Sequence, residues 1–183
     1  MDATAVIFRS RAQPPADDKA AVEQAWKIHQ AQADWTGKVD AKASFAFAIE
    51  SAAIATTVVL SGDKRLFSGR PAGMVDVLYW MGLLVLLAGA LFAVAVVIPR
   101  LKSDGAFKAS KHNYIYFGHV RHWEAAELAE ALKTRDILPV ITRQIVVMGD
   151  IAWQKHRWVQ ISMWCGAFGG LLVGLCGLVI SFT

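Results

Sequence analysis

An uninterrupted apolar run from Leu78 to Ile98 constrains this chain more than any other part of its sequence. The run has 21 residues, and none of them is charged. As an α-helix rising about 1.5 Å per residue, it covers the ~30 Å hydrocarbon core of a bilayer. Tyr79 and Trp80 lie at one end, where amphipathic rings favour the headgroup layer, and Arg100 follows the other end. Buried helices of soluble proteins rarely contain apolar runs this long, so the sequence predicts an integral membrane protein.

Two further apolar runs complete the predicted membrane part. Residues 43–60 contain one charged residue, Glu50, and are rich in the small residues that suit close helix contacts in a bilayer. Residues 161–182 contain no charged residue. The composition agrees, because only 19% of the residues are charged, whereas soluble domains have about 25%. The sequence therefore predicts an all-α integral membrane protein with three transmembrane helices.

Glycines recur along the third predicted span. A small-residue face is formed by Gly166, Gly169, Gly170, Gly174 and Gly177, in which Gly166 and Gly170 form one GxxxG pair and Gly170 and Gly174 form another. Such small-residue faces often pack against a neighbouring helix, and exposure to lipid is the alternative. The run from Leu78 to Ile98 offers no polar seam, so we expect it to face lipid rather than to line a pore.

The other segments are expected to be polar, and most of them helical. Residues 1–16 contain Pro14 and Pro15 and no helical period, as is typical of disorder, and no signal peptide is recognised. Apolar residues at helical spacing favour one helix over 121–135 and another that starts near Pro139 and continues into the third span. The predicted order is a disordered N-terminus (1–16), a cytosolic amphipathic helix (17–42), a transmembrane hairpin (43–98, with spans 43–60 and 78–98), a cytosolic helical excursion (99–160) and a third transmembrane helix (161–182).

The distribution of basic residues predicts the orientation in the membrane. Three spans place the N-terminus and residues 99–160 on the same side. Within about 15 residues of a span, that side carries more Lys and Arg than the hairpin loop, which favours a cytoplasmic location. The basic residues are Lys38, Lys42, Arg100, Lys102, Lys108, Lys111, Lys155 and Arg157 on the first side, and Lys64, Arg65 and Arg70 on the other.

Three charged residues near or inside the first span are candidates for membrane entry and for coupling the cytosolic helices to the spans. Glu50 lies about two turns inside the first predicted span, where a charge is costly unless it is protonated, paired or facing a polar seam. It is interpreted either as a pore or gate lining or as a carboxylate that reaches headgroup water. Asp40 can pair with a cation of the cytosolic helices, and Lys42 can extend to lipid phosphate. Simple interfacial anchoring is the alternative for both residues.

An aromatic segment, Tyr114–Gly118, stands out on the polar side of the chain. Its Tyr114, Tyr116 and Phe117 can stack on a nucleobase, while nearby basic residues neutralise a phosphate. The basic candidates are Arg121, Arg143, Lys155 and Arg157. Aromatic packing between helices explains the same residues, so the segment indicates only that a small anionic aromatic ligand is chemically possible.

Catalytic and metal sites are not indicated by the sequence. His112, His119 and His122 suggest a metal ligand set, but no HExxH motif, nearby cysteine or carboxylate at ligand spacing supports it. Phosphate-binding glycine loops, nucleophile elbows and paired catalytic carboxylates are also missing. We therefore expect no metal and no enzymatic activity, and a membrane-bound metal enzyme is the weakest alternative.

Short motifs occur in a fixed order relative to the predicted spans. Trp35 and the sequence VDAKAS over 39–44 precede the first span, and Tyr116-Phe-Gly118 lies in the excursion. Gln144 and Lys155-His-Arg157 then precede the third span. In this order, over about residues 20–183, the chain resembles the transmembrane effector family of the Pycsar antiphage systems.

That resemblance implies a bacterial inner-membrane effector of antiphage defence. It would sense cyclic CMP or cyclic UMP, made by a pyrimidine cyclase, on its cytosolic side and impair the membrane, causing growth arrest or abortive infection. The implied partners are membrane lipid, the cyclic nucleotide and further copies of the chain in a homo-oligomer, without nucleic acid. The candidate nucleotide-binding residues are then Tyr114, Tyr116, Phe117, Gly118, Arg121, Arg143, Gln144, Lys155 and Arg157. The alternative is a ligand-independent membrane scaffold or small channel subunit that recruits a protein partner.

Overall fold

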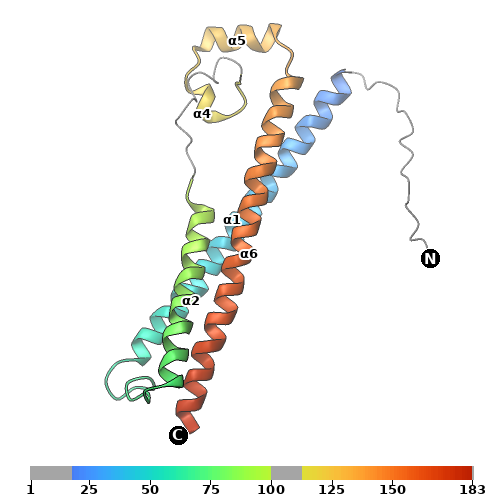
Figure 1. The fold of residues 1–183 in the computed structure, drawn as a ribbon. Helices are drawn as coiled ribbons and strands as arrows, with labels where there is room; N and C mark the ends of the chain where they lie inside the picture. Colours follow the sequence, from blue (N-terminus) through green and yellow to red (C-terminus); the bar gives the residue numbers. More distant parts are fainter. Residues whose placement is uncertain (1–17, 100–112, 183) are drawn as a thin grey trace, which may run out of the picture. The chain divides into compact units, whose positions relative to one another are not determined.

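A computed structural model describes residues 18–99 and 113–182, and within them the protein consists of α-helices joined by loops. Its elements are α1 (Asp18–Leu60), α2 (Met74–Val97), α4 (Phe117–Val120), α5 (Ala125–Thr134) and α6 (Leu138–Phe182) (Figure 1). Among these described elements, α1, α2 and α6 are long and apolar enough to cross a membrane. The predicted all-α fold with three membrane-spanning helices is therefore confirmed. The predicted disordered segment 1–16 and His112 lie outside the described residues.

The chain divides into two compact units, each described by itself. The first unit comprises Met1–Gln30 and Asp104–Ile145, and the second comprises Ala31–Ser103 and Val146–Thr183. Helices α4 and α5 belong to the first unit and α2 to the second, whereas α1 and α6 contribute residues to both. Two helices are therefore covalently continuous from one unit into the other.

Helix boundaries differ from the predicted ones in two places. The segments 17–42 and 43–60 belong to one helix, α1, because a single Gly37 costs only about 1 kcal/mol in a helix and does not end it. Helix α6 starts at Leu138, so that Pro139 occupies the first turn, where its missing N–H is tolerated. The helix predicted over 121–135 is shorter, because Glu124 is extended (φ −77°, ψ 142°) and α5 begins only at Ala125.

Glycines bring α2 and α6 into backbone contact in the second unit. A Cβ atom added at Gly169 would lie 2.8 Å from the backbone nitrogen of Leu86 and 2.9 Å from the carbonyl oxygen of Gly82. A Cβ atom at Gly82 would in turn lie 3.1 Å from the carbonyl oxygen of Gly169. Added Cβ atoms at Gly170 and Gly174 meet no atom within 4 Å. Helix α6 therefore packs against α2 through Gly169. The Gly170–Gly174 pair faces away from α2 and does not contact another described helix.

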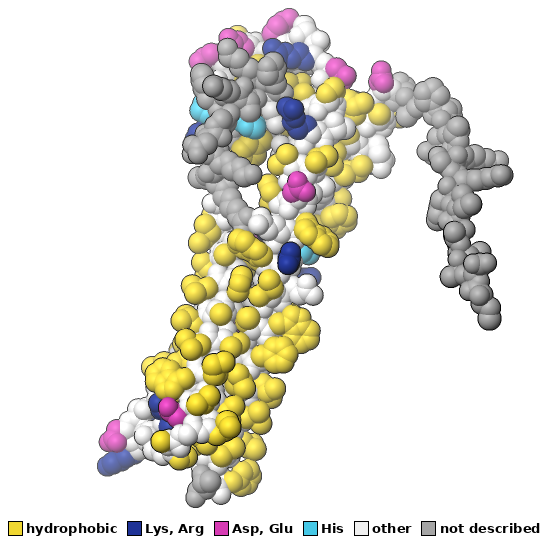
Figure 2. All heavy atoms as spheres, in the orientation of Figure 1, with side chains coloured by type: hydrophobic (Ala, Val, Ile, Leu, Met, Phe, Trp, Pro, Cys, Tyr) yellow, Lys and Arg dark blue, Asp and Glu magenta, His cyan; other side chains and the backbone are white. Residues whose placement is uncertain are grey.

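Helix α2 has a buried stripe as well as an apolar outer face. The buried stripe comprises Tyr79, Gly82, Leu86, Gly89, Ala90, Ala93 and Val96. On the outer face, Leu84, Leu87 and Leu91 are exposed, and Figure 2 shows hydrophobic side chains gathered over the second unit. An exposed apolar surface of this kind suits lipid contact. The expectation that this span only faces lipid is therefore incomplete, because one side of α2 packs within the bundle.

The loop between α1 and α2 is closed by Arg70. Its Nε donates to Asp76 Oδ1 at 2.6 Å, and its Nη1 donates to the carbonyl oxygen of Phe67 at 3.1 Å. The guanidinium carbon lies 4.0 Å from the centre of the Tyr79 ring, a cation–π contact. Phe67 and Tyr79 form a buried cluster with Cys176 of α6. This end of the bundle, named here the hairpin end, thus joins all three spans.

Candidate functional site

An aromatic cluster forms around α4 in the first unit. The Tyr114 ring meets the Trp123 ring edge-on, with 5.8 Å between the ring centres. The Tyr116 ring lies 5.2 Å from the ring of His119 and 4.5 Å from that of Phe117. Phe117 itself is 67% exposed, which leaves its ring accessible for stacking on a ligand.

The local backbone explains why Asn and Gly stand in this segment. The side-chain oxygen of Asn113 accepts a hydrogen bond from the Ile115 N–H at 3.1 Å, as in an Asx turn. A Cβ atom at Gly118 would collide with the ring of Tyr116. Gly118 therefore allows the Tyr116 ring to fold back over the start of α4, and a larger residue would displace that ring.

Two buried polar atoms of the cluster lack a hydrogen-bond partner within the described chain. They are the Tyr114 hydroxyl, on a side chain only 7% exposed, and Nδ1 of His119. An unpaired buried polar group costs about 1–3 kcal/mol, so such groups are rare. Burial, and then the nearby His122, lower the pKa of His119 below its usual value. Near neutral pH, His119 is therefore uncharged and has one donor and one acceptor nitrogen.

The other predicted nucleotide-binding residues are divided between the two units. In the first unit, Arg121 donates through Nε to His122 Nε2 at 3.1 Å, Arg143 is exposed and Gln144 is buried on α6. Lys155 and Arg157 belong to the second unit. The aromatic candidates and Arg121 thus belong to the first unit, whereas Lys155 and Arg157 belong to the second. Trp123, whose ring packs on Tyr114, is a member of the cluster that sequence reasoning did not single out for this site.

An ion pair joins α1 and α6 in the second unit. Lys155 Nζ donates to both carboxylate oxygens of Asp40, at 2.6 and 2.8 Å. Apolar residues of all three long helices, Val39, Ala43, Val96 and Val159, form a buried cluster in this unit. Asp40 therefore holds a cation of α6, and Lys155 has a carboxylate partner.

Glu50 lies in a socket where α1, α2 and α6 meet. The carboxyl group is 2% exposed, and its Oε1 accepts a hydrogen bond from the Ser162 hydroxyl at 3.1 Å. Cβ atoms added at Gly89 and Gly166 would lie 2.7 and 2.8 Å from Oε1. Oε2 has no partner among the described residues. Glu50 is thus enclosed by α1, α2 and α6 within the single chain, and its role in the membrane stays a prediction.

The socket residues Ser162, Gly89 and Gly166 were not predicted as partners of Glu50. Their only sequence signal is a glycine or serine inside an apolar span, which also fits ordinary helix packing. A metal site is not supported by the described residues, because no group of three or more His, Cys, Asp or Glu side chains is placed to hold an ion.

Comparison with known proteins identifies the family. Residues 24–181 match the PycTM family, described as the Pycsar effector protein domain. The chain is also 22% identical over 174 residues to the Pycsar effector protein PtPycTM of Propioniciclava tarda, covering 91% of this chain and 79% of that protein. No solved structure matches it. With three spans and a family match over most of its length, this chain belongs to the PycTM family of Pycsar effectors.

Proposed function

We propose that this protein is an antiphage effector that binds a cyclic pyrimidine nucleotide, cyclic CMP or cyclic UMP, and then impairs the bacterial inner membrane. In this proposal the N-terminus and residues 99–160 are cytoplasmic, and several copies act together because three spans per chain do not easily enclose a pore. The nucleotide is a ligand and not a substrate. Support comes from the family, from the three spans and from the aromatic cluster.

The observation that carries the ligand site is the unpaired Tyr114 hydroxyl. It lies on a side chain that is more than nine-tenths buried, and Nδ1 of His119 in the same unit is a second unpaired buried atom. A pyrimidine ring has both donors and acceptors that can satisfy such atoms. The exposed Phe117 ring supplies a stacking surface, and Arg121 supplies a positive charge for the cyclic phosphate. We therefore assign the nucleotide to the first unit.

Continuous helices offer a route from this site to the membrane. Helix α6 extends without a break from Leu138 to Phe182, and α1 extends from Asp18 to Leu60. A nucleotide that favours one arrangement of the first unit would shift the population of helix orientations in the second. We assign Lys155 to this transmission step, because its ammonium group is held by Asp40.

Binding to the purified full-length protein tests the proposal. Isothermal titration with cyclic CMP, cyclic UMP and cyclic AMP is expected to give saturable binding of a pyrimidine nucleotide. Phe117→Ala should weaken that binding, because base stacking on an aromatic ring contributes about 1–3 kcal/mol. Leu132→Ala, at an exposed apolar position of the same unit, is the matched control and should bind normally.

Membrane impairment is tested in bacteria that express the protein together with a pyrimidine cyclase. Uptake of a membrane-impermeant dye should rise only when the cyclase is active and the effector carries Phe117. The proposal fails if neither pyrimidine nucleotide binds the purified protein. Unchanged thermal stability with every nucleotide, together with specific capture of a protein partner, would instead favour the ligand-independent scaffold.

A further inference from the structure

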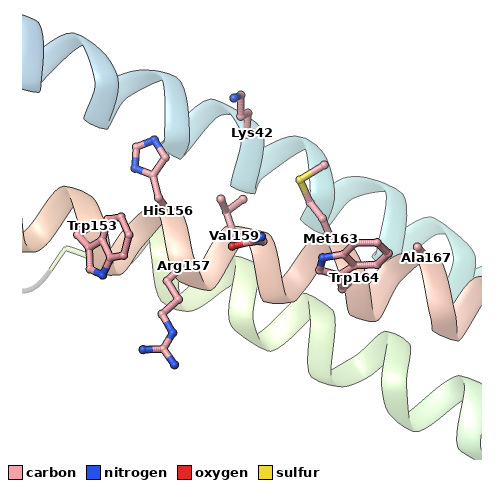
Figure 3. A pocket seen from close by; sticks show the side chains of 9 residues that line it. Lys42, Trp153, His156, Arg157, Val159, Met163, Trp164 and Ala167 are labelled. Carbon is pink, nitrogen blue, oxygen red and sulfur yellow. The ribbon is translucent and has the colours of Figure 1, made fainter. Parts of the chain in front are cut away.

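A groove in the second unit lies along one face of α6 beside α1. It encloses about 770 Å³, and apolar side chains form most of its lining. The lining residues are Lys42 of α1 and Trp153, His156, Arg157, Val159, Gln160, Met163, Trp164 and Ala167 of α6 (Figure 3). The α6 positions recur at intervals of three or four residues, so they share one helix face. Neither the proposed nucleotide site nor the Glu50 socket uses this face.

The groove changes character along its length. Figure 3 shows His156 and Arg157 toward one end, and Met163, Trp164 and Ala167 toward the other. From Arg157 to Ala167 the helix advances about 15 Å, which equals half of a ~30 Å hydrocarbon core. A groove with a cationic end and an apolar end of this depth matches one leaflet of a bilayer.

The charges at the polar end are not used elsewhere in the described structure. Lys42 and Arg157 are exposed, and neither forms an ion pair with a described carboxylate. The neighbouring Lys155 differs, because it is bound to Asp40. His156 Nδ1 donates to the carbonyl oxygen of Ala152 at 2.8 Å, which fixes its ring at the groove. The two unpaired cations flank the groove from opposite sides, Lys42 on α1 and Arg157 on α6, and both are on long, exposed side chains that can reach an anionic headgroup.

We propose that this groove binds one anionic glycerophospholipid. The headgroup phosphate lies at the polar end of the groove, where the exposed side chains of Lys42 and Arg157, which extend to opposite sides in Figure 3, turn toward it when the lipid binds. Gln160 donates to the glycerol ester region. One acyl chain extends over Val159 and Met163 toward Ala167. The indole rings of Trp153 and Trp164, which are 76% and 59% exposed, cover the lipid from the side. The bound lipid thereby fills the open surface between α1 and α6 and becomes part of the bundle wall.

Charge complementarity and length select this occupant. A zwitterionic lipid would place its choline beside two cations, and a free phosphate would leave the apolar end of the groove uncovered. An apolar helix of a second chain would bury Lys42 and Arg157 without a partner, which is costly at a membrane boundary. An anionic lipid pairs its phosphate with the cations and covers the apolar end of the groove with an acyl chain. Such lipids are attracted to basic residues at the membrane surface.

Native mass spectrometry of the full-length protein in detergent tests the proposal. Phosphatidylglycerol, phosphatidylcholine and inorganic phosphate are titrated separately, and the lipid that remains bound per chain is counted. Wild type should retain one phosphatidylglycerol in preference to phosphatidylcholine, and inorganic phosphate should not displace it. The double variant K42Q/R157Q should lower the affinity for phosphatidylglycerol about 30-fold.

Two further variants separate a specific site from general attraction. K27Q/K38Q removes two exposed charges from α1 outside the groove and should retain the lipid normally. Ala167→Phe fills the apolar end without changing charge and should also reduce retention. The proposal is overturned if K42Q/R157Q binds like wild type, if phosphatidylcholine binds equally well, if inorganic phosphate displaces the lipid, or if K27Q/K38Q loses it to the same extent.

Discussion

Substituting Gly169 by alanine should weaken the contact between α2 and α6. The added Cβ atom would lie 2.8 Å from the backbone nitrogen of Leu86 and 2.9 Å from the carbonyl oxygen of Gly82. Real Cβ contacts do not occur at these distances, and backbone atoms cannot rotate away as a side chain can. The two helices must therefore move apart, and overpacking of this kind typically costs about 1–3 kcal/mol.

Gly170→Ala is the matched control for this prediction. It adds the same methyl group one position along α6, where no atom lies within 4 Å. Both variants gain the same helix propensity, about 1 kcal/mol for glycine to alanine, so this contribution cancels when they are compared. The free energy of unfolding should then be about 1–3 kcal/mol lower for Gly169→Ala than for Gly170→Ala, or about 5- to 150-fold in the unfolding equilibrium.

Reversible unfolding in mixed micelles measures this difference. The fraction of denaturing detergent is raised stepwise while tryptophan fluorescence and helicity are recorded for both variants. The chain contains seven tryptophans, so the fluorescence signal is strong. If Gly169→Ala is as stable as Gly170→Ala to within about 0.5 kcal/mol, the close approach of the two helices described here is refuted.

Three other predictions concern polar groups. Asp40→Asn should lower the stability of the bundle by about 1 kcal/mol, because the pair with Lys155 is partly exposed and screened; thermal unfolding measures the loss. The lowered pKa of His119 means that the folded first unit binds fewer protons than the unfolded chain. The contribution of uncharged His119 to the stability of the first unit is fully present above pH ~6.5 and is lost as the pH falls through the lowered pKa. Hydrogen exchange of the first unit between pH 5 and 8 can follow this loss of stability. Ser162→Ala should cost about 1–3 kcal/mol in the same detergent titration, because Glu50 loses the hydrogen bond to its Oε1.

Each of these predictions has its own control. The charge swap D40K/K155D should recover part of the stability lost in Asp40→Asn, and no recovery would argue against a direct pair. His119→Gln should remove the pH dependence in the first unit, so a dependence that persists would point to another group. Ser181→Ala removes a hydroxyl that bonds only within α6, to the Gly177 carbonyl oxygen. It should cost less than Ser162→Ala, and an equal loss would argue against the Glu50 socket.

The membrane part of the fold was predictable because a bilayer imposes a strong one-dimensional constraint. A run such as Leu78–Ile98 needs no knowledge of its neighbours to be recognised as a span. The start of α6 was predictable for the same reason, because the signal, Pro139, lies at the start itself. Which glycines touch another helix was not predictable, because Gly169 and Gly170 differ only in the direction they face, and helix rotation depends on the packing of all three helices.

The sequence predicted some residues of the candidate sites, but not which residues they contact. The aromatic residues of Tyr114–Gly118 were recognised from sequence, but the packing of Trp123 on Tyr114 depends on a turn between α4 and α5 that breaks the expected helix over 121–135. Glu50 was recognised because a charge inside a span is rare. Its partner Ser162 lies 112 positions away and is one of several serines in apolar surroundings, so the pairing required the structure.

The hairpin end has a mechanical consequence for the bundle. There, Arg70 is held by Asp76, by the Phe67 carbonyl group and by the Tyr79 ring, and the same cluster touches Cys176 of α6. The three spans therefore cannot slide along one another at this end without breaking several contacts at once. We therefore expect a rearrangement of the bundle to tilt the spans about this end, from which each extends about 30 Å. A tilt of about 10° would separate their far ends by about 5 Å, close to one helical turn.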